Sequence, residues 1–408
     1  MREVNTIGKI QMVQNNKVDK AAIPSFLSRE ATENVRHFHQ SVPGYAPTPL
    51  TELKDYAAAC GVRSVLIKDE SKRFGLNAFK GAGGVYAVNR VICEHLGIDP
   101  AESTLEMLQS SPYKEEIAKM VFITTTDGNH GKGVSWAAGL LGCKSYVYMP
   151  VGSVEVRAQA IRDAGSAEVK ITDMKYDDCV RYTAALAEKN GWFLVQDTAW
   201  DGYEKIPSWI AQGYSTMIYE AEEQMRALGY ERPTHVFLQA GVGAMAGGAL
   251  GAIANIYREN LPVVSIVEPS ENACIFESAR HGDGKPHSSV GSQVTIMAGL
   301  NCGEPCTVTW PTLDKLSSFY FAFPDNVAAR GMRVLAAPTG QDPKVISGES
   351  GAASMGLVSL LLEKPEYAPF RQALGIDENA VIFMISTEGD TDPEGYRAVV
   401  YDGKYPMD

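Results

Sequence analysis

The feature of this sequence that most constrains its fold is a repeated alternation of short apolar segments with amphipathic helical segments. The apolar segments are continuous, as expected for strands that are covered on both faces of a sheet. They read SVLIKD, MVFITTT, SYVYMP, AEVKIT, WFLVQD, HVFLQAG, VVSIVEP and AVIFMIST. Helical segments such as VEVRAQAIRDAG and MIYEAEEQMRALG separate most of them. This alternation predicts an α/β protein with open, parallel, twisted sheets that are flanked by helices and joined by right-handed crossovers.

The number of strands predicts two lobes with a cleft between them. Eight or so strands are too many for one compact lobe, whereas two lobes of about 150 to 200 residues each fit a chain of 408 residues. We place a large domain at residues 1–86 and 193–408 and a small α/β domain at residues 87–192. The first 50 or so residues are polar and end in the proline-rich PGYAPTPL, so we expect an irregular segment that wraps around the surface.

The composition points to a small-molecule partner. A net charge of -12 disfavours nucleic acid and anionic membranes, which would be repelled at long range. The seven scattered cysteines lack the paired spacing of a zinc site, and their number and spacing favour a reducing cytoplasm. The N-terminal segment has no apolar core of signal-peptide length, and no stretch approaches the roughly 20 apolar residues that span a bilayer. We therefore expect a cytoplasmic protein that is neither exported nor held in a membrane.

Few histidines in the sequence suggest chemistry. His37 and His39 have the spacing of a metal pair, but no carboxylate or third imidazole is clustered with them, so we interpret them as part of a solvated face and predict no metal site. His130 follows a predicted strand, yet nothing beside it resembles a serine or cysteine nucleophile. We interpret His130 as a structural residue at the start of a helix.

One glycine-rich segment is a candidate phosphate site. The segment QAGVGAMAGGALGAIANIY (239–257) leads from a predicted strand into a helix, which is where open α/β sheets bind ligands. Its exposed backbone amides and the positive end of the helix dipole favour an anion. The alternative is that the glycines only permit close packing of the helix on the sheet. A dinucleotide site fits less well, because the spacing differs from GxGxxG after a first strand.

The segment FGLNAFKGAGG (74–84) places Lys80 next to Phe79 and before a run of small residues. An amine beside an apolar residue and a helix N-terminus is expected to have a lowered pKa, which favours the neutral form that attacks an aldehyde. Taken alone, this segment favours an ordinary solvated lysine slightly over a reactive one.

Two further segments end predicted strands with polar residues. In TTTDGNHGKGVSWAA (124–138), Asp127 lies at the strand end and Asn129 is suited to hydrogen-bond a phenolic oxygen. In ISTEGDTD (385–392), a hydroxyl group at the strand end is suited to face a pyridine nitrogen. The neighbouring SGESGAASMGL (347–357) is explained by helix capping alone.

Together these segments resemble the fold-type II pyridoxal-phosphate family, the group of threonine dehydratase and the tryptophan synthase β subunit. AFKGAG resembles that family's S-F-K-x-R-G-A lysine motif, and TDGNHGKG resembles its S-G-N-H-x-Q-G loop. GVGAMAGG resembles its tetraglycine phosphate loop, and ISTEGD resembles its terminal L-S-G-x-G-D strand. The four motifs follow the family order over residues 74–392, which makes the set far more specific than any one of them.

The resemblance implies a pyridoxal 5'-phosphate cofactor and assigns its contacts. Lys80 would hold the cofactor as a Schiff base, Phe79 would pack beside the ring, and Asn129 would bond the phenolic oxygen. Ser386 would contact the ring nitrogen, or Thr387 if the strand register differs by one residue. The phosphate would be bound by backbone amides of the glycine-rich segment, namely those of Gly241, Val242, Gly243, Ala244 and Met245.

Two departures from the dehydratase pattern bear on the substrate. Asp127 stands where the family usually has serine, and QDTAWDGY (196–203) stands where dehydratases carry a neutral proline-phenylalanine segment. A substrate with a second ammonium group would be attracted by Asp127 and Asp197 together. The whole chain resembles the diaminopropionate ammonia-lyase family, which converts 2,3-diaminopropionate into pyruvate and two ammonia.

This resemblance also implies that a different base acts on each isomer of the substrate. Lys80 would be the base for the L isomer, and Asp127 would be the base for the D isomer on the opposite face of the cofactor. Asp197 would bind and orient the leaving ammonium, with Asp201 as its competitor for that role. A serine or threonine dehydratase stays open as an alternative, as does a non-catalytic binder of the cofactor or a nucleotide. The resemblance further implies a homodimer.

Overall fold

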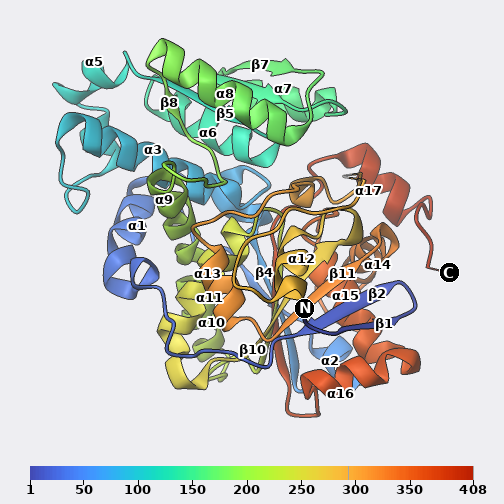
Figure 1. Ribbon diagram of the computed structural model, residues 1–408. Coiled ribbons are helices and arrows are strands. Elements are labelled where there is room, and N and C mark those ends of the chain that lie inside the picture. Colours follow the sequence, from blue (N-terminus) through green and yellow to red (C-terminus); the bar gives the residue numbers. More distant parts are fainter. Residues whose placement is uncertain (293, 408) are drawn as a thin grey trace.

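The computed structural model describes residues 1–292 and 294–407, and its strands form a larger and a smaller sheet (Figure 1). The strands of the larger sheet are β1 (Val4–Ile7), β2 (Ile10–Gln14), β3 (Leu50–Glu52), β4 (Ser64–Asp69), β9 (His235–Gln239), β10 (Val263–Pro269), β11 (Phe319–Phe323) and β12 (Val381–Ser386). The strands of the smaller sheet are β5 (Val121–Thr125), β6 (Lys144–Met149), β7 (Glu168–Ile171) and β8 (Phe193–Leu194). We call the parts built on these sheets the larger and the smaller lobe.

The helices alternate with the central strands along the chain. The α-helices are α1 (Arg29–Ser41), α2 (Lys54–Cys60), α3 (Lys80–Leu96), α4 (Leu105–Leu108), α5 (Tyr113–Ile117), α6 (Asn129–Leu140), α7 (Glu155–Gly165), α8 (Tyr176–Asn190), α9 (Lys205–Gly213), α10 (Ser215–Ala227), α11 (Ala244–Tyr257), α12 (Cys274–His281), α13 (Trp310–Leu316), α14 (Asp325–Ala336), α15 (Ala353–Glu363), α16 (Ala368–Leu374) and α17 (Pro393–Val400). The 3-10 helices are η1 (Ser25–Leu27), η2 (Glu70–Gly75), η3 (Arg258–Asn260), η4 (Ser270–Asn272), η5 (Ala298–Leu300) and η6 (Pro365–Tyr367).

The centres of both sheets are parallel, which confirms the predicted α/β fold. The larger sheet has the order β1-β2-β11-β10-β9-β12-β4-β3, and the smaller has the order β7-β6-β5-β8. All strand pairs of the smaller sheet are parallel, as are the pairs from β11 to β4 in the larger one. Strands β1, β2 and β3 instead run antiparallel at the edges.

The expectation of an irregular first segment was wrong. Residues 4–14 form a β-hairpin that extends the larger sheet past β11, and Gly8 supplies the positive φ of +58° in its turn. Helix α1 follows, and the Ser28 hydroxyl caps its N-terminus by accepting a hydrogen bond from the amide of Ala31. Strand β11 was also absent from the predicted strands, although its sequence FYFAF is fully apolar.

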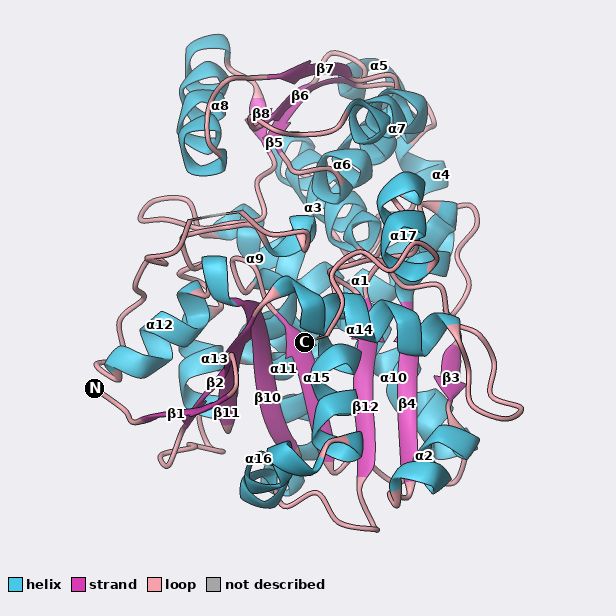
Figure 2. Cartoon of the chain, turned by 90° about the vertical axis from the view of Figure 1, so that its right-hand side faces the viewer, coloured by secondary structure: helices cyan, strands magenta, loops and turns pink. Residues whose placement is uncertain are grey.

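Helices cover both faces of the larger sheet. In Figure 2, α10 and α11 lie behind the sheet, whereas α14, α15 and α16 lie in front of it. Along β4, Leu66 belongs to the core on the side of α10 and α11, whereas Val65 and Ile67 belong to the core on the side of α14 and α15. Since both faces are buried, every residue of β4 is buried, which explains the continuous apolar run at residues 65–67.

Helices α3 and α6 pack backbone against backbone through glycines. A Cβ atom on Gly133 would lie 3.0 Å from the Cα of Gly81 and 3.0 Å from the carbonyl oxygen of Lys80. A Cβ atom on Gly84 would lie 3.1 Å from the carbonyl carbon of Gly133. Because neither approach leaves room for a side chain, these glycines bring the start of α3 directly onto α6.

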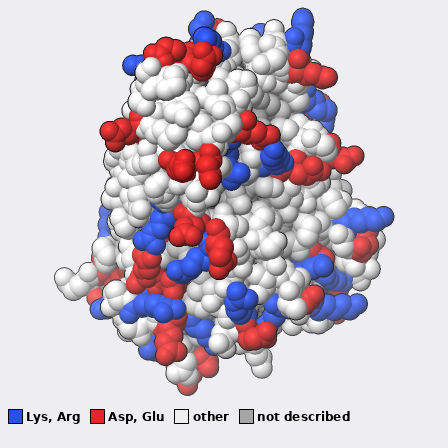
Figure 3. All heavy atoms as spheres, turned by 90° about the vertical axis from the view of Figure 1, so that its left-hand side faces the viewer, with Lys and Arg blue, Asp and Glu red and all other residues white. Residues whose placement is uncertain are grey.

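One face of the molecule shows how charges of both signs are distributed on it. On the face drawn in Figure 3, acidic and basic side chains are interspersed. Within residues 1–292 and 294–407, no helix combines the length and apolar character needed to cross a membrane. The seven cysteines are all described, and each is a free thiol.

Candidate active site

A cavity lies at the carboxyl ends of β9 and β12, next to the N-termini of α3, α6 and α11. This is the position at which parallel α/β sheets bind ligands. The described residues that line it are Phe79, Lys80, Asn129, Asp197, Tyr214, Gln239, Ala240, Gly241, Val242, Gly243, Ala244, Met245, Ala246, Gly299, Leu300, Cys302, Ser350, Thr387 and Glu388. The cavity therefore brings together most of the site residues predicted from four separate segments of the sequence.

Lys80 and Asp197 form an ion pair inside this cavity. Lys80 is the first residue of α3, and its Nζ lies 2.6 Å from Oδ2 of Asp197. Burial disfavours the ammonium form, but the charges of Asp197 and Asp127 outweigh it, so the pKa of Lys80 is raised above its ordinary value. The prediction of a lowered pKa for Lys80 was therefore wrong for this arrangement. The pKa of Asp197 is lowered to about 2, because His130 and Lys80 together outweigh the effect of burial.

His130 has a backbone contact and also faces Asp197. It is the second residue of α6, and its Nε2 donates a hydrogen bond to the carbonyl oxygen of Val195 at 2.7 Å. Its Nδ1 lies 3.8 Å from Oδ2 of Asp197 and has no hydrogen-bond partner among the described residues. Burial lowers the pKa of His130, against the opposing effect of the charge of Asp197. Asp201, the competitor of Asp197, is exposed, whereas Asp197 is buried.

The glycine-rich segment forms an anion cradle at the start of α11. Gly243 is the residue before the helix and has a φ of +88°, a conformation that side chains other than glycine rarely adopt. The first backbone amides of α11 have no intrahelical partner and point toward the cavity end of the helix. Residues 299–300 close the cradle on one side. They approach Gly241 so closely that a Cβ atom added to it would lie 3.1 Å from the carbonyl oxygen of Gly299.

The end of β12 presents Thr387 to the cavity. The side chain of Thr387 accepts a hydrogen bond from Nε2 of Gln239 at 3.1 Å, and both residues line the cavity. Ser386 is buried with its hydroxyl donating to Oγ of Ser347 at 2.7 Å, and it is not among the described residues that line the cavity. Of the two strand registers left open by the sequence, the structure has the one that directs Thr387 inward.

Asn129 and Glu388 meet across the cavity. The Asn129 side-chain amide donates a hydrogen bond to the carboxylate of Glu388, and the backbone amide of Ser350 donates to the same carboxylate at 3.1 Å. Burial and the charge of Glu349 raise the pKa of Glu388 to about 7, although Arg157 opposes this. The sequence reasoning missed Glu388, even though it lies within the ISTEGDTD segment. It likewise missed Tyr214, whose ring centroid is 4.8 Å from that of Phe79.

Asp127 lies in an adjoining hollow. This hollow is lined by Asp127, Arg157, Glu349 and Asn301 among others, and residues next to Glu349 and Asn301 in sequence line the cavity of Lys80. An ion pair between Arg157 of the smaller lobe and Glu349 of the larger lobe spans it. The charge of Asp127 acts on the pKa of Lys80, so the two residues belong to one electrostatic site.

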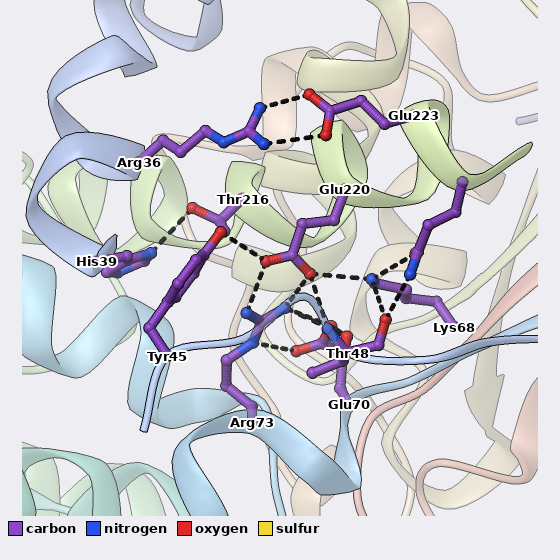
Figure 4. Close-up of polar contacts among 11 residues, drawn as sticks. Arg36, His39, Tyr45, Thr48, Lys68, Glu70, Arg73, Thr216, Glu220 and Glu223 are labelled. Atoms are coloured by element: carbon purple, nitrogen blue, oxygen red, sulfur yellow. Dashed lines mark hydrogen bonds and ion pairs between the residues drawn. The ribbon is translucent and has the colours of Figure 1, made fainter. Parts of the chain in front are cut away.

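A buried ion cluster anchors the chain segment that leads to Lys80 (Figure 4). We define this cluster as Lys68, Glu70, Arg73 and Glu220, whose side chains are at most 1% exposed. Glu220 accepts hydrogen bonds from Lys68 at 2.9 Å and from the two terminal nitrogens of Arg73 at 2.8 and 2.7 Å. Glu70 accepts two more from Arg73, both at 2.8 Å. The two positive and two negative groups are thus paired within the protein.

His39 lies beside the ion cluster and contacts the helix of Lys80. Its Nε2 donates to the carbonyl oxygen of Ala82 at 2.9 Å, and its Nδ1 accepts from the Thr216 hydroxyl at 2.9 Å. The interpretation of His39 as part of a solvated face was therefore wrong, whereas His37 is exposed. Within the described residues, no group of three or more histidine, cysteine or acidic residues is placed to hold a metal ion.

The loop between Arg73 and Lys80 is held at its N-terminal end by the ion cluster. Its C-terminal end is held by residues that follow β12. The amide of Phe79 donates to the carbonyl oxygen of Thr387 at 2.9 Å, and the amide of Gly389 donates to that of Asn77 at 3.1 Å. Phe74 and Asn77 both have positive φ, at +52° and +58°. Such conformations cost energy outside glycine and persist where the surroundings hold them, so this loop is a constrained element of the site.

The cavity fits pyridoxal 5'-phosphate, because it brings together the amine of Lys80, the anion cradle at the start of α11 and the side chain of Thr387. The sequence comparisons agree with this cofactor. The family model described as "Pyridoxal-phosphate dependent enzyme" matches residues 42–372. The chain therefore belongs to the family of pyridoxal-phosphate-dependent enzymes.

Two relatives and one solved structure carry the same activity in their names. The chain is 48% identical over 401 residues to a diaminopropionate ammonia-lyase of Escherichia coli strain K12, covering 98% of each chain. It is 45% identical over 392 residues to a diaminopropionate ammonia-lyase of Salmonella typhimurium, covering 96% of this chain and 97% of the relative. A crystal structure of the Escherichia coli enzyme in complex with D-serine matches with a TM-score of 0.92 and 45% identity, covering 99% and 100% of the two chains. These matches confirm the resemblance on which the sequence interpretation rested.

Proposed function

We propose that the chain eliminates ammonia from D- and L-2,3-diaminopropionate, giving pyruvate and two ammonia. The observation that carries this proposal is the placement of Asp127 and Asp197 around the buried amine of Lys80. Two carboxylates favour a substrate with a second ammonium group and disfavour one that has only a hydroxyl. The names of the relatives with 45% and 48% identity agree with this substrate.

In this proposal Lys80 is both the anchor for the cofactor and a base. When bound, the cofactor supplies an electron sink that stabilises the negative charge left by removal of the α-proton. The amine of Lys80 would hold the cofactor at its aldehyde carbon, and as a free neutral amine Lys80 would take the α-proton of the L isomer. Asp127 takes the α-proton of the D isomer. Asp197 orients the leaving ammonium group and holds Lys80 in place between these steps.

Backbone and side-chain groups around the cavity would hold the cofactor. We assign the phosphate to the amides of residues 241–245, namely Gly241, Val242, Gly243, Ala244 and Met245. Phe79 packs beside the ring, and Asn129 donates to its phenolic oxygen. For the ring nitrogen we assign Thr387 in place of Ser386, because Thr387 lines the cavity.

The decisive experiment compares four substrates on the purified enzyme with its cofactor. We expect both diaminopropionate isomers to give pyruvate with a higher kcat/KM than D- or L-serine. Treatment with borohydride should label Lys80 and abolish turnover. A kcat/KM that is higher for serine than for diaminopropionate would contradict the substrate assignment and favour a serine dehydratase. Absence of labelling at Lys80 would contradict catalysis through this residue.

We also propose a domain division, an assembly and a location. The large domain comprises residues 1–86 and 193–408, and the small one comprises residues 87–192. Strand β8 pairs with β5 and begins at residue 193, so the smaller sheet extends two residues past this boundary. A homodimer is proposed from the family resemblance. A cytoplasmic location is supported by the seven unpaired cysteines.

A further inference from the structure

Glu388 is a buried carboxylate that has no role in the proposed reaction. It is 2% exposed and follows β12 by two residues. Its side chain is held by the amide groups of Asn129 and Ser350, one on each carboxylate oxygen. Its backbone forms a β-bridge with Ala78, two residues before Lys80. Glu388 therefore contacts both of the segments that carry Lys80 and Asn129.

The contact with Glu388 determines which atom of Asn129 faces it. A primary amide has two N–H donors on one side and an acceptor oxygen on the other. An ionised carboxylate only accepts hydrogen bonds, so it excludes the orientation in which the Asn129 oxygen faces Glu388. One N–H of Asn129 is used by this contact. The other N–H remains available to the cavity that Asn129 lines.

We propose that Glu388 is a positioning residue for the cofactor, because its carboxylate holds the Asn129 amide with an N–H directed at the phenolic oxygen of pyridoxal 5'-phosphate. This inference rests on the proposed function, in which Asn129 bonds that oxygen. With the opposite orientation, the Asn129 oxygen would face the phenolic oxygen and repel it. Glu388 would thus set the strength of a cofactor contact without touching the cofactor itself.

The groups around Glu388 make this control dependent on pH. The charged residues that act most strongly on the pKa of Glu388 are Glu349, Arg157 and Asp127. Burial, Glu349 and Asp127 raise the pKa of Glu388 to about 7, against the opposing effect of Arg157. Above this pH the carboxylate is an acceptor and fixes Asn129 as described. Below it the protonated group is able to donate to the Asn129 oxygen, so the amide is no longer held in one orientation.

A double-mutant cycle on the holoenzyme tests the proposal. The proteins are the wild type, Glu388→Gln, Asn129→Ala and the double variant, with Asp390→Asn as a control. Asp390 lies in the same loop and accepts a hydrogen bond from Asn77, so its variant removes a nearby carboxylate that does not contact Asn129. Two quantities are measured: the dissociation constant of pyridoxal 5'-phosphate by equilibrium dialysis, and the visible absorbance of the bound cofactor between pH 6 and 9.

We expect Glu388→Gln to weaken cofactor binding by about 10-fold, the effect of losing one oriented hydrogen bond. It should also remove a spectral transition near neutral pH that the wild type and Asp390→Asn retain. In the Asn129→Ala background, Glu388→Gln should change the dissociation constant by less than about 2-fold, because the residue that it orients is gone.

Two results would overturn the proposal. Full additivity of the two substitutions would mean that Glu388 acts independently of Asn129. An unchanged spectrum and affinity in Glu388→Gln would mean that it does not act on the cofactor. Neither the dissociation constant nor the absorbance depends on turnover. If both behave as expected but the enzyme does not convert diaminopropionate, only the proposed substrate is contradicted.

Discussion

The Nζ atom of Lys80 lies 2.6 Å from Oδ2 of Asp197, and both groups are nearly enclosed by protein. In this pair the ammonium and the carboxylate stabilise each other's charged form, which raises the pKa of Lys80 and lowers that of Asp197. A lysine must lose its proton before it attacks an aldehyde. Asp197 therefore controls how readily Lys80 becomes reactive.

We expect Asp197→Asn to lower the pKa of Lys80. The cofactor-free variant should then bind pyridoxal 5'-phosphate faster at neutral pH than the wild type does, while turnover falls because the leaving ammonium is no longer oriented. Stopped-flow absorbance across a pH series gives the midpoint of this binding rate. Asp201→Asn is the matched control, since Asp201 is exposed and its charge is not among the main influences on the pKa of Lys80. An unchanged midpoint in Asp197→Asn would show that Lys80 is activated in another way.

The two-base proposal predicts that Asp127→Asn separates the isomers. Removal of a general base costs about 100- to 10,000-fold in rate, so kcat/KM for the D isomer should fall by that factor. For the L isomer, whose base is Lys80, the fall should stay within about 10-fold. The measurement is pyruvate formation from each isomer by the same holoenzyme. Equal losses of kcat/KM for both isomers would contradict the proposal that each isomer has its own base.

The buried ion cluster predicts a large effect on stability. Glu220→Gln leaves Lys68 and Arg73 without a full counter-charge in a site closed to water. Removing one partner of a buried ion pair typically costs about 3 to 5 kcal/mol, and we expect the free energy of unfolding in urea to fall by that amount. Glu223→Gln on the same helix breaks an exposed pair with Arg36, and its cost should be about 1 kcal/mol or less. Similar losses in both variants would contradict this account.

His39 predicts a pH dependence of stability. Burial and the charge of Arg73 lower its pKa to about 4, although its hydrogen bond to Ala82 and the charge of Glu220 oppose this. The ordinary value is 6.5, so the unfolded chain binds a proton more readily than the folded one between pH 6.5 and 4. The contribution of neutral His39 is thus complete above pH 6.5 and declines as the pH falls toward 4, by about 3 kcal/mol in total.

The matching variant is His39→Gln, which retains a donor and an acceptor without titrating. The difference in unfolding free energy between the wild type and this variant, measured in urea at several pH values, should change between pH 6.5 and 4. A difference that is constant over this range would exclude His39 as the source.

The fold was largely predictable because its central strands are buried on both faces and appear as continuous apolar runs. The hairpin at residues 4–14 escaped prediction, since VNTI and IQMVQ mix polar and apolar residues and pair only at a sheet edge. Strand β11 was missed although its sequence FYFAF has the continuous apolar character of the strands that were predicted.

The candidate site was predictable where a motif is local in sequence. Lys80, Asn129 and the glycine-rich segment each lie at the start of a helix, so the local pattern identifies them. The roles of other residues depend on distant partners. Arg73 and Glu220 are 147 residues apart, and Asn129 and Glu388 are 259 residues apart. No local pattern shows that such side chains meet. The raised pKa of Lys80 was missed for the same reason, because it depends on Asp197, 117 residues away.

The glycine contact between α3 and α6 has a consequence for how this enzyme tolerates change. Gly133 lies against the backbone of Lys80 itself, and no flexible side chain stands between them to absorb a displacement. A methyl group added at Gly133 would press on the backbone of Lys80, the residue that carries the reactive amine. The distance between the amine and the helix that carries Asn129 therefore depends on the absence of a side chain at Gly133, and even an alanine there would require this backbone to shift.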